Sequence, residues 1–172
     1  MKSGALVAAG SLVFTVLVAG SAHAQTAKAE FHNAQGQSAG SATLTQRPNG
    51  VKIALHLSHL PPGAHGFHIH AVGKCDPPAF TTAGGHLNPG GRLHGTETAV
   101  GPHDGDLPNL AAGPDGTVKA EAMAYRVTLG PGKDSLFHPG GTSLVIHAGP
   151  DDYTTDPAGN SGARIACAII TQ

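Results

Sequence analysis

Tryptophan is absent from the 172 residues, and only 4% of them are aromatic. Charged residues are also scarce, at 12%, and their formal sum is −1. This balance provides no basic patch of the kind that nucleic-acid-binding domains use, so we expect no nucleic-acid partner. Glycine (25) and proline (13) are abundant, which favours many short elements joined by turns over a helical bundle. The length suits one domain.

Helix-period segments of convincing length are also lacking after the first 24 residues. Short segments that alternate or carry β-branched residues are instead separated by turn sequences such as RPNG at 47–50. The expected strands are 27–33, 41–45, 51–57, 65–71, 118–124, 126–128, 143–147 and 164–170. About eight strands at this spacing predict an all-β fold, an antiparallel sandwich or barrel. Residues 72–115 and 148–163 carry little strand signal, and loops of such length are usually functional or disordered.

The N-terminus has the pattern of a secretory signal peptide. Lys2 precedes an uncharged apolar run at 5–20, and Ala22-His23-Ala24 fits cleavage after Ala24. The alternative is a retained membrane anchor, because the run is nearly long enough to span a bilayer. We expect residues 1–24 to be removed, leaving a single domain at 25–172 in the periplasm or otherwise outside the cell, with no membrane attachment.

Cysteine occurs only twice, as Cys75 and Cys167. An exported chain reaches an oxidising compartment, where two cysteines suggest one disulfide. The alternative is one reactive thiol and one buried thiol. A disulfide would close a loop of about 90 residues and contribute roughly 4–5 kcal/mol at most in chain-entropy models.

Histidine is unusually frequent, with 12 residues against 10 lysines and arginines together. The sequence GAHGFHIH at 63–70 places His68 and His70 two apart on an expected strand. Their side chains then share one face, about 7 Å apart, and two such imidazoles can converge on one metal ion. The alternative is an exposed pair on a polar face.

Three further histidines and a carboxylate follow in the first long loop: His86, His94, His103 and Asp106. Three imidazoles and one carboxylate suit a closed, four-coordinate structural zinc site. Such a metal would order the loop that carries its ligands. The alternative is a flexible histidine-rich loop.

Two residues near the second loop are ambiguous when taken alone. His147 ends the apolar run SLVI, where it could face a metal or simply solvent. Arg164 opens the last expected strand after GNSGA, and small residues there would allow a guanidinium to enter a tight pocket. An ordinary arginine at a strand start is the alternative reading.

Taken together, these motifs resemble copper–zinc superoxide dismutase of the bacterial exported type, over residues 27–171. The segments GAHGFHIH and GNSGARIAC look like the two signatures of that family, and the spacing H-x7-H-x8-H-x2-D is similar to its zinc pattern. The resemblance implies a Greek-key β-sandwich, or flattened barrel, with two long functional loops.

The same resemblance implies a role for each matching residue. The copper ligands would be His68, His70, His86 and His147, and the zinc ligands would be His86, His94, His103 and Asp106. His86 would therefore bridge both metals, Asp151 would hydrogen-bond to His68 and His94, and Cys75 would pair with Cys167. His65 resembles a structural residue.

The family chemistry would follow from one copper and one zinc per subunit, with the superoxide anion as substrate. Copper would alternate between Cu(II) and Cu(I), His86 would supply one of the two protons, and Arg164 would hold the anion. Residues 148–163 contain no lysine or arginine, where many relatives have a lysine that attracts superoxide. Lys74 is the nearest candidate by sequence, with a solvated surface lysine as the alternative.

An alternative function is a non-catalytic relative that carries copper or zinc on the same sandwich. Such proteins tend to lose a copper ligand or the arginine, and this chain keeps both. A structural or adhesion sandwich is a more distant alternative, because eight positions match the metal sites. The sequence leaves open whether the chain is a monomer or a homodimer.

Overall fold

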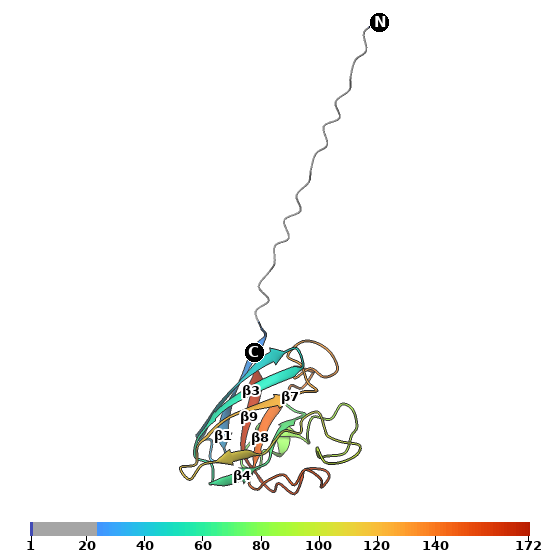
Figure 1. Ribbon diagram of the computed structural model, residues 1–172. Coiled ribbons are helices and arrows are strands. Elements are labelled where there is room, and N and C mark those ends of the chain that lie inside the picture. The colour runs from blue at the N-terminus through green and yellow to red at the C-terminus, as the bar shows by residue number, and fades with distance from the viewer. Residues whose placement is uncertain (2–23) are drawn as a thin grey trace.

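The computed structural model describes Met1 and residues 24–172, so nearly all of the predicted signal peptide lies outside the described residues (Figure 1). The described chain has nine strands: β1 Thr26–Asn33, β2 Ser38–Arg47, β3 Gly50–Leu57, β4 Gly63–His65, β5 Phe67–His70, β6 Leu110–Ala112, β7 Val118–Ala124, β8 Ser143–His147 and β9 Arg164–Thr171. One short 3-10 helix, η1, spans Thr81–Ala83. Over the described residues, no helix has the length and apolar character needed to cross a bilayer.

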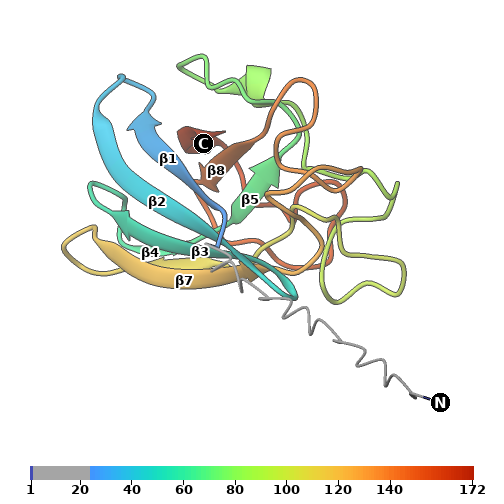
Figure 2. The same cartoon turned by 90° about the horizontal axis from the view of Figure 1, so that it is seen from above.

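Seven strands form one antiparallel sheet in the order β5-β8-β9-β1-β2-β3-β7, and β4 pairs with β6 in a second, two-stranded sheet. The large sheet curls strongly, as the view from above shows (Figure 2). The predicted all-β antiparallel fold is therefore confirmed.

Side chains alternate between two faces of the sheet, because successive residues of a strand point in opposite directions. In β1, Ala27, Ala29 and Phe31 are buried while their neighbours are exposed or partly exposed. The inward residues of all the large strands meet in one apolar core, to which β5 contributes Phe67 and Ile69. The fold therefore leaves the opposite face of β5 free for His68 and His70.

That opposite face is covered in the region of β5, β8 and β9. All four residues of β5 and all five of β8 are buried, so both faces of these strands are shielded. Part of the cover is a second apolar cluster, in which Phe80 and Ala83 pack on Val145 and Cys167. The first long loop is thus folded back onto the outside of the sheet.

Three strand predictions were wrong in detail. The expected strand 65–71 is divided at Gly66, whose N–H donates to Gly149 O and whose carbonyl accepts from His147 N. Residues 126–128 form a turn and an isolated bridge between Thr128 and Ser135, because Tyr125 and Arg126 already leave the sheet. Strand β6 lies inside the loop that was expected to lack strands.

Candidate metal centre

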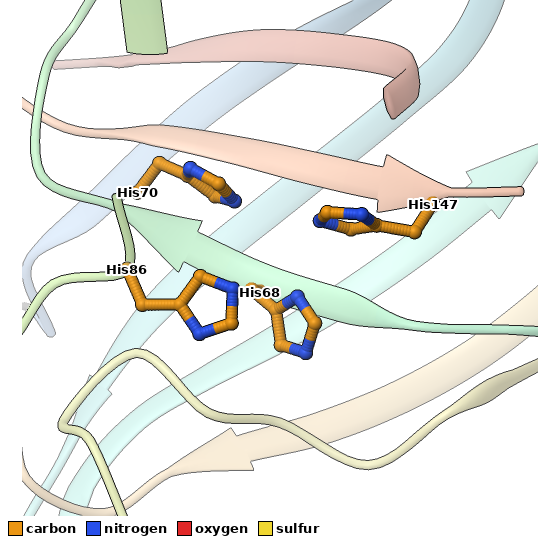
Figure 3. Close-up of side chains that lie close together, drawn as sticks. All are labelled: His68, His70, His86 and His147. Atoms are coloured by element: carbon orange, nitrogen blue, oxygen red, sulfur yellow. The ribbon is translucent and has the colours of Figure 1, made fainter. Parts of the chain in front are cut away.

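Four histidines meet on the outer face of the sheet (Figure 3). His68 and His70 come from β5, His147 ends β8, and His86 reaches in from the first long loop. Strands β5 and β8 are hydrogen-bonded neighbours. His70 and His147 can therefore lie together although they are 77 residues apart in the sequence. The ring centroids of the six possible pairs are 3.9 to 6.4 Å apart.

One nitrogen of each of three rings faces a fixed acceptor. His70 Nδ1 lies 2.9 Å from Gly84 O, His147 Nδ1 lies 3.0 Å from Gly162 O, and His68 Nε2 lies 2.8 Å from Asp151 Oδ2. These acceptors place the ring proton on the outer nitrogen, so the opposite nitrogen carries a lone pair.

The inward nitrogens are buried and have no hydrogen-bond partner within the described chain: His68 Nδ1, His70 Nε2, His86 Nε2 and His147 Nε2. Unpartnered buried nitrogens are costly, and here four of them converge closely enough to hold one metal ion. The donor set fits copper, because imidazole nitrogen is a good ligand for that metal.

Burial also keeps these rings neutral. Desolvation lowers the pKa of His68 to about 3, of His70 to about 2 and of His147 to about 4, and it lowers the pKa of His86 as well. A neutral imidazole offers a free lone pair at neutral pH, as metal binding requires.

The first long loop reaches this face because its backbone extends the edge of β5. Ile69 N donates to Gly105 O at 2.9 Å, and Leu87 N donates to Ile69 O at 2.8 Å. Isolated bridges pair His68 with Asp106 and His70 with His86. A Cβ at Gly105 would overlap Ile69 O, so only glycine permits this approach.

A second group forms around the Asp106 carboxylate. Its Oδ1 lies 2.9 Å from His86 Nδ1, 3.0 Å from His94 Nδ1 and 3.3 Å from His103 Nδ1. Its Oδ2 accepts hydrogen bonds from the backbone N–H groups of Gly95 and His103, both at 2.9 Å. Three imidazoles and one carboxylate are thus gathered closely enough to hold an ion, a donor set that fits zinc.

Charge is unevenly distributed in this second group. Burial opposes ionisation of Asp106, but its hydrogen bonds to His103, His86 and His94 lower its pKa well below the usual range. Burial also opposes the charge on His94, yet hydrogen bonds to Asp106 and Asp151 raise the pKa of His94 to about 9. A metal ion bound at His94 Nδ1 would therefore displace a proton.

Asp151 connects the two groups. Its Oδ2 accepts from His68 Nε2 at 2.8 Å, and its Oδ1 accepts from His94 Nε2 at 3.0 Å. The same Oδ1 accepts from Tyr153 N at 2.7 Å. Burial opposes the charge of Asp151, but these hydrogen bonds lower its pKa below the usual value. The contacts predicted for Asp151 are present in the structure.

Arg164 lies directly opposite His147 in the β8–β9 pair, because the register shifts by one residue between Ile146 and His147. Its Nη1 donates to Phe80 O and its Nη2 to Gly84 O, both at 2.6 Å. A fixed guanidinium therefore lines a cavity of about 370 Å³ together with His70, His86 and His147.

The acceptors of Arg164 lie in the segment that the disulfide anchors. Cys75 and Cys167 are bonded, as predicted, and no free cysteine is present among the described residues. The bond ties the first long loop to β9 at Cys75, a few residues before Phe80 and Gly84, whose carbonyls orient Arg164. Both ring nitrogens of His65 lie 2.7 Å from backbone oxygens, Nδ1 from His147 O and Nε2 from Pro61 O. These contacts are those of a structural residue.

Two residues around the site, Asn109 and Arg92, were not identified from the sequence. Asn109 holds the backbone of Asp151, accepting from its N–H at 2.8 Å and donating to its carbonyl at 2.9 Å. Arg92 lines the same cavity as Arg164, whereas Lys74, the candidate by sequence, does not. Neither residue is of a metal-binding type, and no local pattern marks them.

Comparisons with known proteins agree with this geometry. The family model described as copper/zinc superoxide dismutase (SODC) matches residues 38–170. Superoxide dismutase (Cu-Zn) 1 of Aquifex aeolicus (strain VF5) is 51% identical over 144 residues, which are 83% of this chain and 85% of that protein. Superoxide dismutase (Cu-Zn) 2 of the same organism is 47% identical over 172 residues, 99% of each chain.

A solved structure also superposes on the fold. It is a double mutant of a SOD-like protein from Bacillus subtilis, with a TM-score of 0.82 and 38% sequence identity. The superposition covers 84% of this chain and 97% of the other.

Proposed function

Because the chain belongs to the copper/zinc superoxide dismutase family, we propose that its two residue groups are the copper and zinc sites of such an enzyme. The chain is an oxidoreductase that converts two superoxide anions and two protons into dioxygen and hydrogen peroxide. Its cofactors are copper and zinc. The proposal concerns which residues perform this activity.

Copper is assigned to the four unpartnered inward nitrogens: His68 Nδ1, His70 Nε2, His86 Nε2 and His147 Nε2. Zinc is assigned to the group gathered at Asp106 Oδ1: His86 Nδ1, His94 Nδ1, His103 Nδ1 and the carboxylate itself. The observation that carries the assignment is the position of His86. Its Nε2 belongs to the first group, and its Nδ1 lies 2.9 Å from Asp106 in the second.

When bound, copper supplies one-electron chemistry between Cu(II) and Cu(I). The residues of the chain do the rest. Asp151 holds the outer nitrogens of His68 and His94, so one carboxylate orients a ring of each site. His86 Nε2 is the position that would hold a proton for the product. Zinc, enclosed by four protein ligands, would have the structural role of ordering the first long loop.

Arg164 would bind the substrate anion. Both nitrogens at the end of its fork are held by carbonyls, so its positive charge stays at the cavity with little loss of entropy on binding. Superoxide is a small monoanion with little surface to contact, and Coulomb attraction must therefore provide most of its recognition.

This role is tested by Arg164→Ile, with Arg164→Lys as the matched variant. The isoleucine variant should retain both metals and lose about 10- to 100-fold in rate, with a flatter dependence on salt. The lysine variant should recover part of the rate, since it restores the charge without the planar fork. A metal-loaded isoleucine variant with the rate and salt slope of the wild type would contradict the role.

The second candidate function is a non-catalytic metal carrier with the same fold. Arg164 shares one pocket with His70, His86 and His147. All four inward nitrogens, including that of His68, are present. Both observations support the enzyme over the carrier. Turnover by the metal-loaded protein distinguishes the two.

Export remains part of the proposal. A signal peptide at 1–24, a mature domain at 25–172 and a periplasmic location are supported by the N-terminal sequence and by a disulfide, which is usual in oxidising compartments. Mass spectrometry of the protein from a periplasmic fraction should find Gln25 at its N-terminus. Sedimentation of that material would also distinguish the monomer from the homodimer, both of which the sequence leaves open, and would test the absence of membrane attachment.

A further inference from the structure

The cavity in front of the two metal groups has a second positively charged residue in its wall. Its charged lining residues, apart from histidine, are Arg92, Arg164 and Asp156. Arg164 is bound to two carbonyls, and Asp156 is occupied by the zinc-side residues. Asp156 Oδ1 accepts from His94 N at 2.7 Å and lies 3.8 Å from His103 Nε2. Arg92 therefore contributes a positive charge that no carboxylate in the cavity neutralises directly.

The backbone of Arg92 is fixed by the side chain of Asn88. Asn88 Oδ1 accepts from Arg92 N at 2.9 Å, and Asn88 Nδ2 donates to Arg92 O at 2.8 Å. This pair of bonds closes the segment 88–92 into a compact turn within an otherwise irregular loop. The turn holds the backbone of Arg92 beside the cavity that this residue lines.

The guanidinium of Arg92 is exposed, and within residues 24–172 it has no hydrogen bond or ion pair. Its other side borders a smaller pocket with Asp104, Arg126, Lys133 and Asp134. Arg92 is the nearest in effect of three cations that act on Asp104, ahead of Arg126 and Lys133, but none of the described cations lies within 4.0 Å of that carboxylate. Arg92 thus forms no direct ion pair on that side, and its guanidinium is not tied to Asp104.

From these observations we infer that Arg92 attracts the substrate anion into the cavity, in place of the lysine that residues 148–163 lack. A positive charge at the mouth of a cleft with low-dielectric walls raises the local concentration of anions and their rate of entry. The inference rests on the proposed function, because superoxide is the anion in question. It deepens that function by adding a residue that acts before Arg164.

The test compares Arg92→Gln with two control variants that remove the same charge outside the cavity lining, Arg126→Gln and Lys74→Gln. Each protein is loaded with copper and zinc, and its metal content is measured. Azide is then titrated at about 0.1 M ionic strength, where charges more than roughly 10 Å apart are screened. The absorbance of the cupric centre reports azide binding, so this measurement does not depend on turnover. The salt slope of superoxide turnover is a second measurement.

Arg92→Gln should weaken azide binding about two- to fivefold and flatten the salt slope, while metal content is unchanged. Both controls should match the wild type, and Arg92→Lys should recover most of the azide affinity because the charge is restored. If Arg92→Gln binds azide as tightly as Arg126→Gln does, the inference is wrong. Failure of the proposed function would instead appear as absent turnover in the wild type, and the azide comparison would still decide the role of Arg92.

Discussion

Replacement of Asp151 by alanine should weaken both metal sites at once. The carboxylate accepts from His68 Nε2 at 2.8 Å and from His94 Nε2 at 3.0 Å, and both rings are fully buried. Removal of the carboxylate leaves two N–H groups without an acceptor and without access to water. Each unsatisfied buried donor costs about 1–3 kcal/mol, so the metal-free fold should lose about 2–6 kcal/mol of stability.

Metal affinity should fall as well, because Asp151 orients one ring of each proposed site. Loss of an outer partner of a metal-bound histidine typically costs about 10- to 100-fold in affinity. Chelator competition, performed separately for copper and zinc, measures this loss, and thermal unfolding of the metal-free protein measures the stability term.

Two variants provide the controls. Asp151→Asn keeps one carbonyl acceptor and should give intermediate losses. Asp152→Ala removes the neighbouring carboxylate, which is exposed and accepts hydrogen bonds from Thr154 and Thr155 without touching a histidine ring. It should leave both affinities unchanged. If Asp151→Ala binds both metals as tightly as Asp152→Ala does, the carboxylate does not couple the two sites and the reasoning is refuted.

The remaining predictions concern zinc and the disulfide. Asp106→Ala should lose zinc and loosen residues 72–115 while copper stays bound, and unchanged thermal stability in the zinc-free variant would count against a structural zinc. Zinc binding should release about one proton below pH 9, because hydrogen bonds raise the pKa of His94 to about 9 in the metal-free protein. The apparent zinc affinity should then fall as the pH is lowered, and a pH-independent zinc titration would contradict the argument. Reduction of Cys75–Cys167 should lower the melting temperature, because the bond spans 92 residues and contributes up to about 4–5 kcal/mol, and a calorimetric scan with and without reductant tests this.

Much of the site could be predicted because its residues lie in short patterns with strict geometry. The alternation of a strand puts His68 and His70 on one face, and the structure has them there with Phe67 and Ile69 in the core. Cys75 and Cys167 pair in the structure as the export signal and the family resemblance implied. These inferences needed only the period of a strand or the chemistry of a side chain.

Features that depend on contacts between distant segments could not be predicted. Gly66 divides β4 from β5 because it bonds to Gly149 and His147 in the later part of the chain. Strand β6 has only three residues and exists through its pairing with β4. Arg92 gains its place at the cavity from a turn held by Asn88, which no periodic pattern reveals.

The central claim is that this chain dismutates superoxide with copper and zinc bound to its two histidine groups. Its most direct test is stopped-flow or pulse-radiolysis measurement of superoxide decay by the mature protein, with metal content determined on the same sample. The account predicts rapid catalytic decay at one copper and one zinc per chain, loss of the activity on removal of copper, and recovery when copper alone is returned. A protein loaded with both metals that leaves superoxide decay at the rate of a protein-free control, or one that iron or manganese restores fully, would contradict it.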